Sequence, residues 1–304
     1  MIEMGIGKAF TSLFKERRWW VKFGIIFSIS YLAIALSLIT GVMDLGKNAN
    51  SIKSYTTLEL TTTLLIGLVA LIVSIILVVF SLWYNYENTQ AAIQNRQTKL
   101  IWEYSFSDSV KKTAKYGVAS IVYGLISFVI SMVVIGIPVF ATIILMGFIY
   151  DSATVSKEYG VIIGLGFILL CCIFTVVVLG LMAFVYALTT PGYLRLVASN
   201  TFSEAFHFRS NLRIGKKYFG YFIAAILILL VFSFVLGFAT SIFSAVSTAV
   251  SLTNPVFGLI LQLIIQIPAT IVTTYLSYFV FPKILGNIYR GIISKEDELK
   301  FLRK

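Results

Sequence analysis

The sequence has few of the residues that build most catalytic and metal centres. It contains one histidine, two cysteines and only 12% charged residues in 304 positions. The two cysteines, Cys171 and Cys172, are adjacent within an apolar run, and this spacing provides neither a disulfide framework nor a metal motif. The single histidine, His207, cannot form a metal site or a catalytic triad by itself. Disulfide scaffolds and metal-dependent enzymes are therefore not expected.

The low charge content also argues against a water-soluble globule. Hydrophobic residues make up 59% of the chain and the mean hydropathy is +0.94, whereas an ordinary soluble domain has about 25% charged residues. The net charge of +11 comes from Lys and Arg divided among short segments between apolar runs, so no nucleic-acid-binding face is expected. Lipid is the expected solvent.

Six apolar stretches predict an all-α fold, a polytopic bundle of six transmembrane helices. A helix needs about 20 apolar residues to cross the hydrocarbon layer, and each stretch reaches that length. Backbone groups in lipid must pair within their own segment, which favours helices. The stretches are residues 23–43, 64–84, 117–149, 161–188, 218–240 and 257–281. The third stretch is long and contains Pro138, so it is either one kinked helix or includes a re-entrant segment.

The six apolar stretches contain no Asp, Glu, Lys, Arg or His. Ionisable residues within spans usually mark proton relays, ion-coupled transport and intramembrane catalysis. The chain also has no GxxxxGK[ST] sequence that would bind nucleotide phosphates. We therefore expect a protein that is not an enzyme and holds no cofactor, and any nucleotide hydrolysis would come from a separate ATPase partner.

Lys and Arg divide the segments outside the stretches into two alternating classes. The segments at the amino end and after the second, fourth and sixth stretches contain five, five, five and six basic residues. The three segments between them contain two, one and none. The positive-inside rule places the rich class in the cytoplasm. We expect a multi-pass protein of a prokaryotic cytoplasmic membrane, with both termini cytoplasmic.

Internal similarity predicts three repeats within one membrane domain over 1–304, with units of approximately 1–95, 96–195 and 196–304. Phe10, Phe106 and Phe202 recur at a spacing of 96 residues, and each opens a basic segment that leads into a span. Each unit is expected to contain an interfacial basic helix, a span, an outer loop and a returning span. Such symmetry is common among transporters, and simple duplication of a membrane hairpin also produces it.

The basic leading segments are candidate contacts for anionic lipid headgroups or a partner protein. In the first, an apolar stripe faces away from the cations, as expected of a helix lying in the membrane interface; the stripe comprises Ile2, Ile6, Phe10, Leu13 and Phe14. The candidate contacts are Lys15, Arg17, Arg18, Lys111, Lys112, Lys115, Arg213, Lys216 and Lys217. The alternative interpretation is that these cations only fix the topology, and this reading is favoured because every polytopic protein needs such an anchor.

Polar residues at helical spacing lie along the sixth stretch, on one face that Pro268 interrupts. They are Gln262, Gln266, Thr270, Thr273 or Thr274, and Ser277. This face could line a hydrated path or bind a headgroup or peptide. Hydrogen bonding between helices is the favoured alternative, at about 0.6 kcal/mol for each bond.

Short motifs across most of the chain resemble a family of archaeal and bacterial membrane proteins, the domain-of-unknown-function 4013 family. The motifs are Phe14-Lys15 to Lys22-Phe23-Gly24, Trp102-Glu103 before Asp108, Ser203 to Arg209 before the fifth stretch, and Gly286 to Arg290 after the sixth. The resemblance implies a multi-span helical protein and supplies no catalytic residues. A more distant similarity to the membrane domain of some glycerophosphodiesterases implies a role in lipid handling.

Two functional hypotheses follow from these patterns. The first is a non-catalytic membrane protein, a transport or accessory subunit that handles a lipid or peptide, alone or with an ATPase. The second is a membrane-embedded scaffold whose basic cytoplasmic helices bind a partner. The sequence specifies neither the ligand nor the oligomeric state.

Overall fold

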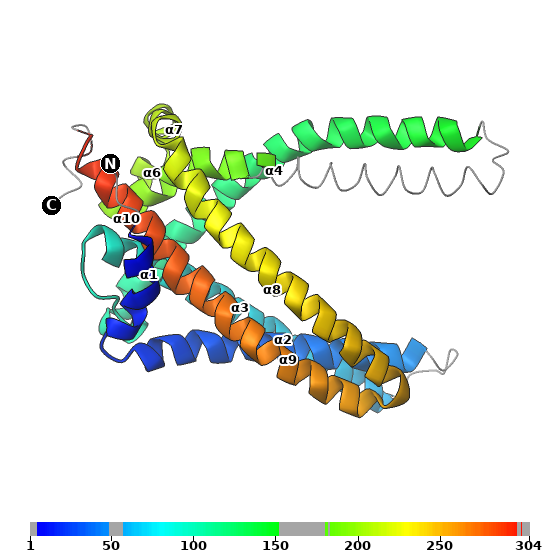
Figure 1. Ribbon diagram of the computed structural model, residues 1–304. Helices are drawn as coiled ribbons and strands as arrows, with labels where there is room; N and C mark the ends of the chain where they lie inside the picture. Colours follow the sequence, from blue (N-terminus) through cyan, green and yellow to red (C-terminus); the bar gives the residue numbers. More distant parts are fainter. Residues whose placement is uncertain (1–4, 49–56, 152–179, 182, 297–298, 300–304) are drawn as a thin grey trace. The chain divides into compact units, whose positions relative to one another are not determined.

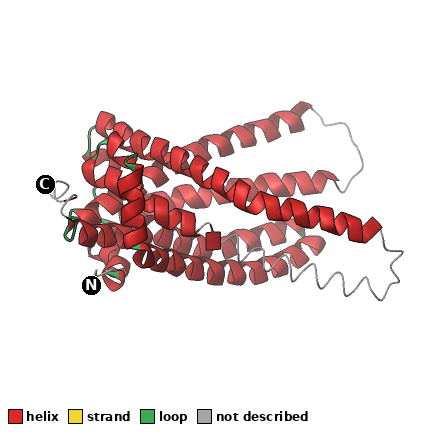
Figure 2. Ribbon diagram, turned by 90° about the horizontal axis from the view of Figure 1, so that it is seen from above, coloured by secondary structure: helices red, strands yellow, loops and turns green. Residues whose placement is uncertain are grey.

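The computed structural model describes residues 5–48, 57–151, 180–181, 183–296 and 299. Within these ranges no residue lies in a β-strand, and helices connected by short turns make up the chain (Figure 1, Figure 2). The expected all-α class is confirmed.

The described helices follow the expected stretches and extend beyond most of them. In chain order they are α1 (Ile6–Ser12), η1 (Leu13–Lys15), α2 (Trp19–Asn48), α3 (Thr57–Ile93), η2 (Ile101–Glu103), α4 (Phe106–Asp151), a helix over 183–199, α6 (Phe202–Ala205), α7 (Phe208–Lys217), α8 (Phe219–Thr253), α9 (Pro255–Tyr275), η3 (Leu276–Val280) and α10 (Phe281–Ile293). The third stretch, 117–149, lies within α4 and is one uninterrupted helix. Most of the fourth stretch, 161–188, lies outside the described residues.

Four of the described helical segments are long and apolar enough to cross a membrane. They are Trp19–Leu36, Leu64–Ile93, Phe219–Val250 and Val256–Ile293. These segments correspond to the first, second, fifth and sixth expected stretches. The six-span count, the threefold repeat and the orientation remain predictions.

The three leading segments differ in their local structure. The first ends in a turn after η1, with Arg18 at a positive φ of 57°, and α2 starts at Trp19. The third, α7, is separated from α8 by a turn at Tyr218. The second has no break, because residues 106–116 belong to α4. The expectation of a separate interfacial helix in every unit is therefore wrong for the second one.

The fifth and sixth spans are joined by a short turn at Asn254. Its side chain accepts a hydrogen bond from the backbone N–H of Phe257 at 3.1 Å, and Pro255 occupies the first turn of α9, where no N–H is needed. Helix α9 then continues through one turn of π-helix, η3, into α10 (Figure 1). Such π turns are rare and are often found at functional sites.

The described chain divides into two compact units. One comprises Met1–Tyr116, Val197–Asn200 and Leu227–Lys304, and the other comprises Gly117–Leu196 and Thr201–Ile226.

In the first unit, α3 packs against α2 and α10, and α2 also packs against α9. Its hydrophobic core contains Leu13, Ile26, Trp83, Tyr84 and Phe279, which are all almost fully buried. Leu13 therefore ties the amino-terminal segment to the spans.

In the second unit, aromatic and polar contacts hold α4, α6 and α7 and the helix over 183–199. The rings of Tyr123 and Tyr193 lie 4.8 Å apart, and the Tyr123 hydroxyl donates to the carbonyl of Ala205. Arg195 donates to Glu204 at 2.5 Å, which fixes α6 to the preceding helix. These contacts account for the short α6, which could not persist as an isolated helix.

Candidate anion-binding site

The amino-terminal segment α1–η1 docks on the protein through its apolar side. Leu13 is buried in the core, and Phe10 contacts the ring of Tyr275, whose hydroxyl donates to the Phe10 carbonyl. Among the described residues of the expected stripe, Phe14 is exposed, and its ring lies 5.1 Å from that of Trp19. Protein therefore covers much of a face that we expected to lie in the interface, and the cations of the opposite face remain accessible.

A buried carboxylate, Glu16, lies at the centre of the charged groups below this segment. Its oxygens accept hydrogen bonds from Lys22 at 2.7 Å, from Lys283 and from the hydroxyl of Thr98 at 3.0 Å. Lys22 also donates to the Thr98 carbonyl. Charged groups this deeply buried must be paired, because desolvation of a lone ion costs several kcal/mol. Glu16 therefore connects the amino-terminal segment, the 96–100 segment and α10.

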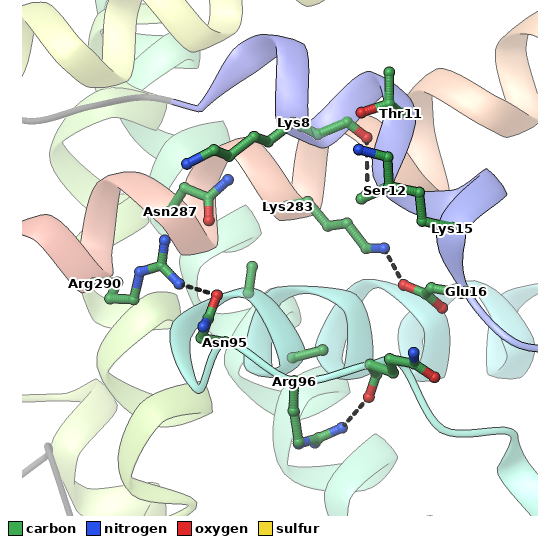
Figure 3. A pocket seen from close by; sticks show the side chains of 14 residues that line it. Lys8, Thr11, Ser12, Lys15, Glu16, Asn95, Arg96, Lys283, Asn287 and Arg290 are labelled. Atoms are coloured by element: carbon green, nitrogen blue, oxygen red, sulfur yellow. Dashed lines mark hydrogen bonds and ion pairs between the residues drawn. The ribbon is translucent and has the colours of Figure 1, made fainter.

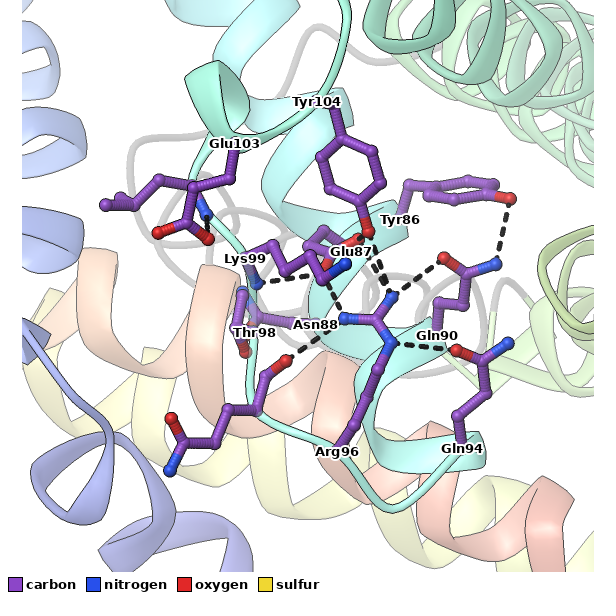
Figure 4. A network of polar contacts seen from close by, with 12 residues as sticks. Tyr86, Glu87, Asn88, Gln90, Gln94, Arg96, Thr98, Lys99, Glu103 and Tyr104 are labelled. Carbon is purple, nitrogen blue, oxygen red and sulfur yellow. Dashed lines mark hydrogen bonds and ion pairs between the residues drawn. The ribbon is translucent and has the colours of Figure 1, made fainter.

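A second buried carboxylate, Glu87, organises the residues that follow α3 (Figure 4). Arg96 donates to both of its oxygens, the Tyr104 hydroxyl donates to it at 3.1 Å, and the backbone N–H of Lys99 donates to it at 2.9 Å. The paired Arg–carboxylate geometry is the strongest form of ionic hydrogen bond. The 96–100 segment is thereby held in a defined path.

Burial and charge set the protonation states around Glu87. Burial and the negative charge of Glu87 raise the pKa of Tyr104 to about 12, so its hydroxyl stays protonated. Burial works against the charge of Arg96, but its hydrogen bond and attraction to Glu87 outweigh this effect and raise its pKa. Burial lowers the pKa of Lys112, whose ammonium group lies 4.0 Å from the Tyr104 ring centre.

The first cationic pocket is a cavity of about 390 Å³ between α1–η1, the carboxyl end of α3 and α10 (Figure 3). Its charged lining residues are Lys8, Lys15, Glu16, Arg96, Lys283 and Arg290, and its polar ones are Thr11, Ser12, Asn95, Gln97 and Asn287. Five cations surround the cavity and one carboxylate lies among them. Such a lining is suited to a phosphate or carboxylate group.

Some of these cations are already engaged within the protein. Lys283 is paired with Glu16, Arg96 with Glu87, and Arg290 donates to the side chain of Asn95 at 2.7 Å. No ion pair with a described carboxylate is found for Lys8 or Lys15, which lie two helical turns apart on the pocket side of α1–η1. These two lysines are therefore the groups most available to an anion.

The second cationic pocket, also about 390 Å³, lies along the 96–99 segment and the turn that precedes α2. Its lining residues are Arg17, Arg18, Lys22, Arg96, Gln97, Thr98, Lys99 and Glu103. Glu103 is partly engaged, because it accepts the backbone N–H of Leu100 at 3.0 Å. This pocket also has five cations and one carboxylate.

Comparison with known families gives one match. A profile described as "Protein of unknown function (DUF4013)" matches residues 66–245, which is more than half of the chain. The chain belongs to the DUF4013 family. Comparison with curated proteins and with solved structures gives no match.

The DUF4013 match covers only part of the two cationic pockets. It includes Glu87, Arg96 and Tyr104, whereas Lys8 and Lys283 lie outside the matched residues. The Glu87 network is thus part of the family's matched region, and the first cationic pocket is completed by helices at the two ends of the chain.

The sequence-predicted basic contacts of this DUF4013 chain separate into three groups. Lys15 lines the first cationic pocket, and Arg17 and Arg18 line the second. In the second group, Lys111 is exposed, Lys112 lies over the Tyr104 ring, and Lys115 donates to the Asn200 carbonyl at 2.9 Å. The third group is exposed on α7, in the other unit, and comprises Arg213, Lys216 and Lys217.

Sequence reasoning did not single out Lys8, Glu16, Lys283 or Arg290 as members of one site. Lys283 meets Glu16 across 267 positions of the chain, and no local pattern reports such a distance. The only available signal was that Lys283 and Arg290 directly follow the last apolar stretch.

The polar residues of the sixth stretch make contacts within and between helices. Gln262 of α9 donates to the Ser244 hydroxyl of α8 at 3.0 Å, and Ser247 of α8 donates to the Gly258 carbonyl at 2.8 Å. The Thr270 hydroxyl donates to the Gln266 carbonyl one turn earlier. Thr274 is buried, and Ser277 lies in the π turn, so the contacts give the face a packing role; a ligand site there stays a prediction.

Among the described residues, no group of three or more His, Cys, Asp or Glu side chains could hold a metal ion.

Proposed function

We propose that this chain is a non-catalytic membrane protein, a transport or accessory subunit that binds an anionic lipid at its basic end. The expected setting is the cytoplasmic membrane of a prokaryote, with the first cationic pocket at the cytoplasmic surface. The observation that carries the proposal is this pocket, built at the ends of apolar helices from α1–η1, α3 and α10.

Exposed aromatic rings support a position at the lipid headgroups. Phe14 of η1, beside Lys15, is exposed, and so are Trp19 and Trp20 at the start of α2. Trp is enriched at the membrane–water interface, where its ring contacts acyl chains while its N–H reaches water. An anionic headgroup at this depth would meet Lys8 and Lys15 and the polar side chains of Ser12 and Asn287.

The state of the two buried carboxylates supports a non-catalytic role. A general acid or base must exchange its proton with a substrate. Glu16 is engaged by two ammonium groups and Glu87 by a guanidinium and a phenol, and both are almost fully buried. Both carboxylates are thus engaged by structural partners, and Glu87 lines neither pocket.

The proposal is tested by counting bound phosphatidylglycerol on the detergent-solubilised protein with native mass spectrometry. The double variant Lys8→Gln/Lys15→Gln should weaken binding about ten- to thirtyfold, because each cation near an anionic surface contributes about 1 kcal/mol. The matched control Arg209→Gln/Lys295→Gln removes the same charge from exposed positions that line neither pocket and are not among the candidate lipid contacts. An equal loss in both variants, or no loss in the first, would reject the pocket as the lipid site.

A further inference from the structure

The two cationic pockets share a wall. Arg96 and Gln97 line both of them, and Gln97 is exposed. The side chain of Arg96 is held by Glu87, and its guanidinium also donates to the Gln97 carbonyl at 3.0 Å. A ligand that crosses the exposed Gln97 would therefore reach both pockets at once.

A buried ion pair connects the residues that line the two pockets. Glu16 lines the first pocket and Lys22 lines the second. The Lys22 ammonium group and the Glu16 carboxylate form an ion pair at 2.7 Å beside the 96–99 segment. Lys22 also donates to the carbonyl of Thr98 in that segment. The spacing between the pockets is thus set before any ligand binds, which lowers the entropic cost of binding at both.

Each pocket has cations left for a ligand. Lys8 and Lys15 serve the first pocket, and Arg17 and Arg18 serve the second; no ion pair with a described carboxylate is found for any of the four. Arg17 and Arg18 are both exposed. Because each pocket has its own pair of available cations, two separate anionic groups would fit the two pockets better than one.

The backbone at Arg18 gives an independent observation. Its φ of 57° lies in the left-handed region, which glycine adopts freely and which costs other residues about 1–2 kcal/mol. Asn95, on the first pocket, also has a positive φ, but asparagine tolerates that region. An arginine at a position suited to glycine indicates that the side chain has a use that offsets the strain.

We propose that one lipid carrying two phosphate groups binds across the shared wall, with one phosphate in each cationic pocket. This inference rests on the proposed function and specifies its ligand class. The chemistry that fits is a lipid such as cardiolipin, in which two phosphates are attached to one glycerol. Binding at two linked sites increases affinity well beyond that of either site alone.

Native mass spectrometry of the detergent-solubilised protein, with cardiolipin and phosphatidylglycerol compared at equal phosphate concentration, tests the proposal. The wild-type chain should bind one cardiolipin at least about tenfold more tightly than phosphatidylglycerol. Either Arg18→Gly or Lys8→Gln/Lys15→Gln alone should remove this preference, since one remaining pocket holds only one phosphate. Arg18→Gly suits the local backbone, and its thermal unfolding in detergent should show at least wild-type stability.

Four results would overturn the inference. Equal affinity for the two lipids, or two cardiolipin molecules per chain, would show independent pockets and leave the proposed function standing. Displacement of cardiolipin by soluble pyrophosphate at the same phosphate concentration would show that the site takes a free anion. Absence of binding of either lipid to the wild-type chain and to the Arg209→Gln/Lys295→Gln control would reject the proposed function as well.

Discussion

At the scale of single residues, the fold depends on a carboxylate that bridges two ammonium groups. Glu16 pairs with Lys22, which is six positions later in the chain, and with Lys283 of α10. All three side chains are at most 7% exposed, so each ion relies on the others for its counter-charge. Some of the few charged residues of the chain thus form buried ion pairs that connect its segments, and others are exposed.

Replacing Glu16 by glutamine should destabilise the protein by about 3–5 kcal/mol, because two buried ammonium groups lose their counter-charge. Thermal unfolding of the detergent-solubilised protein measures this effect. Asp108→Asn is the matched control, since Asp108 is exposed and its loss should change stability by no more than about 0.5 kcal/mol. Similar melting temperatures for Glu16→Gln and wild type would show that Glu16 does not tie α10 to the amino-terminal segment.

The residues that meet in the site could be predicted only in part from the sequence. Lys15, Arg17 and Arg18 were candidate anion contacts because basic residues beside a span are easily recognised, although a topology anchor was the favoured reading; the structure places them on two pockets. Glu16 lies between Lys15 and Arg17 in the sequence, yet its role depends on Lys283. A contact between residues this far apart is set by tertiary packing and has no local sequence pattern.

At the scale of helices, hydropathy located the spans but not the helix ends. The second stretch was expected to end at residue 84, and α3 continues to Ile93 because packing buries its polar last turns, including Glu87 and Asn88. Likewise α8 runs to Thr253, well beyond the expected end at residue 240. The π turn η3 had no sequence signal, since single π turns depend on local packing.

Close packing of α10 against α3 depends on Gly286. A Cβ atom at this position would lie 2.6 Å from the Ala92 methyl group and 2.6 Å from the Thr89 carbonyl oxygen. Gly286→Ala should therefore force the helices apart and cost about 1–3 kcal/mol, measured by thermal unfolding in detergent.

The control for this prediction is Gly67→Ala on α3, where a Cβ atom would meet nothing within 4 Å. That variant should keep or slightly raise stability, because alanine is the better helix former. If Gly286→Ala were as stable as Gly67→Ala, the close approach of α10 and α3 would be refuted.

At the scale of the whole molecule, composition alone predicted the helical membrane class. The excess of apolar residues and the absence of charge within the stretches leave few other folds, and the described helices agree. The division into two compact units had no sequence signal, because three of its four boundaries fall inside helices, in α4, in α8 and in the helix over 183–199. Orientation in the membrane stays a prediction, drawn from the distribution of Lys and Arg.

The central claim is that the basic end of the helices, with its two cationic pockets, faces the cytoplasm. The direct test places a thiol in the first pocket with Ser12→Cys, in a chain whose own cysteines are removed by Cys171→Ser and Cys172→Ser. A membrane-impermeant maleimide should label this thiol in inverted membrane vesicles and leave it unlabelled in intact cells. Labelling from outside intact cells would contradict the orientation and the account built on it.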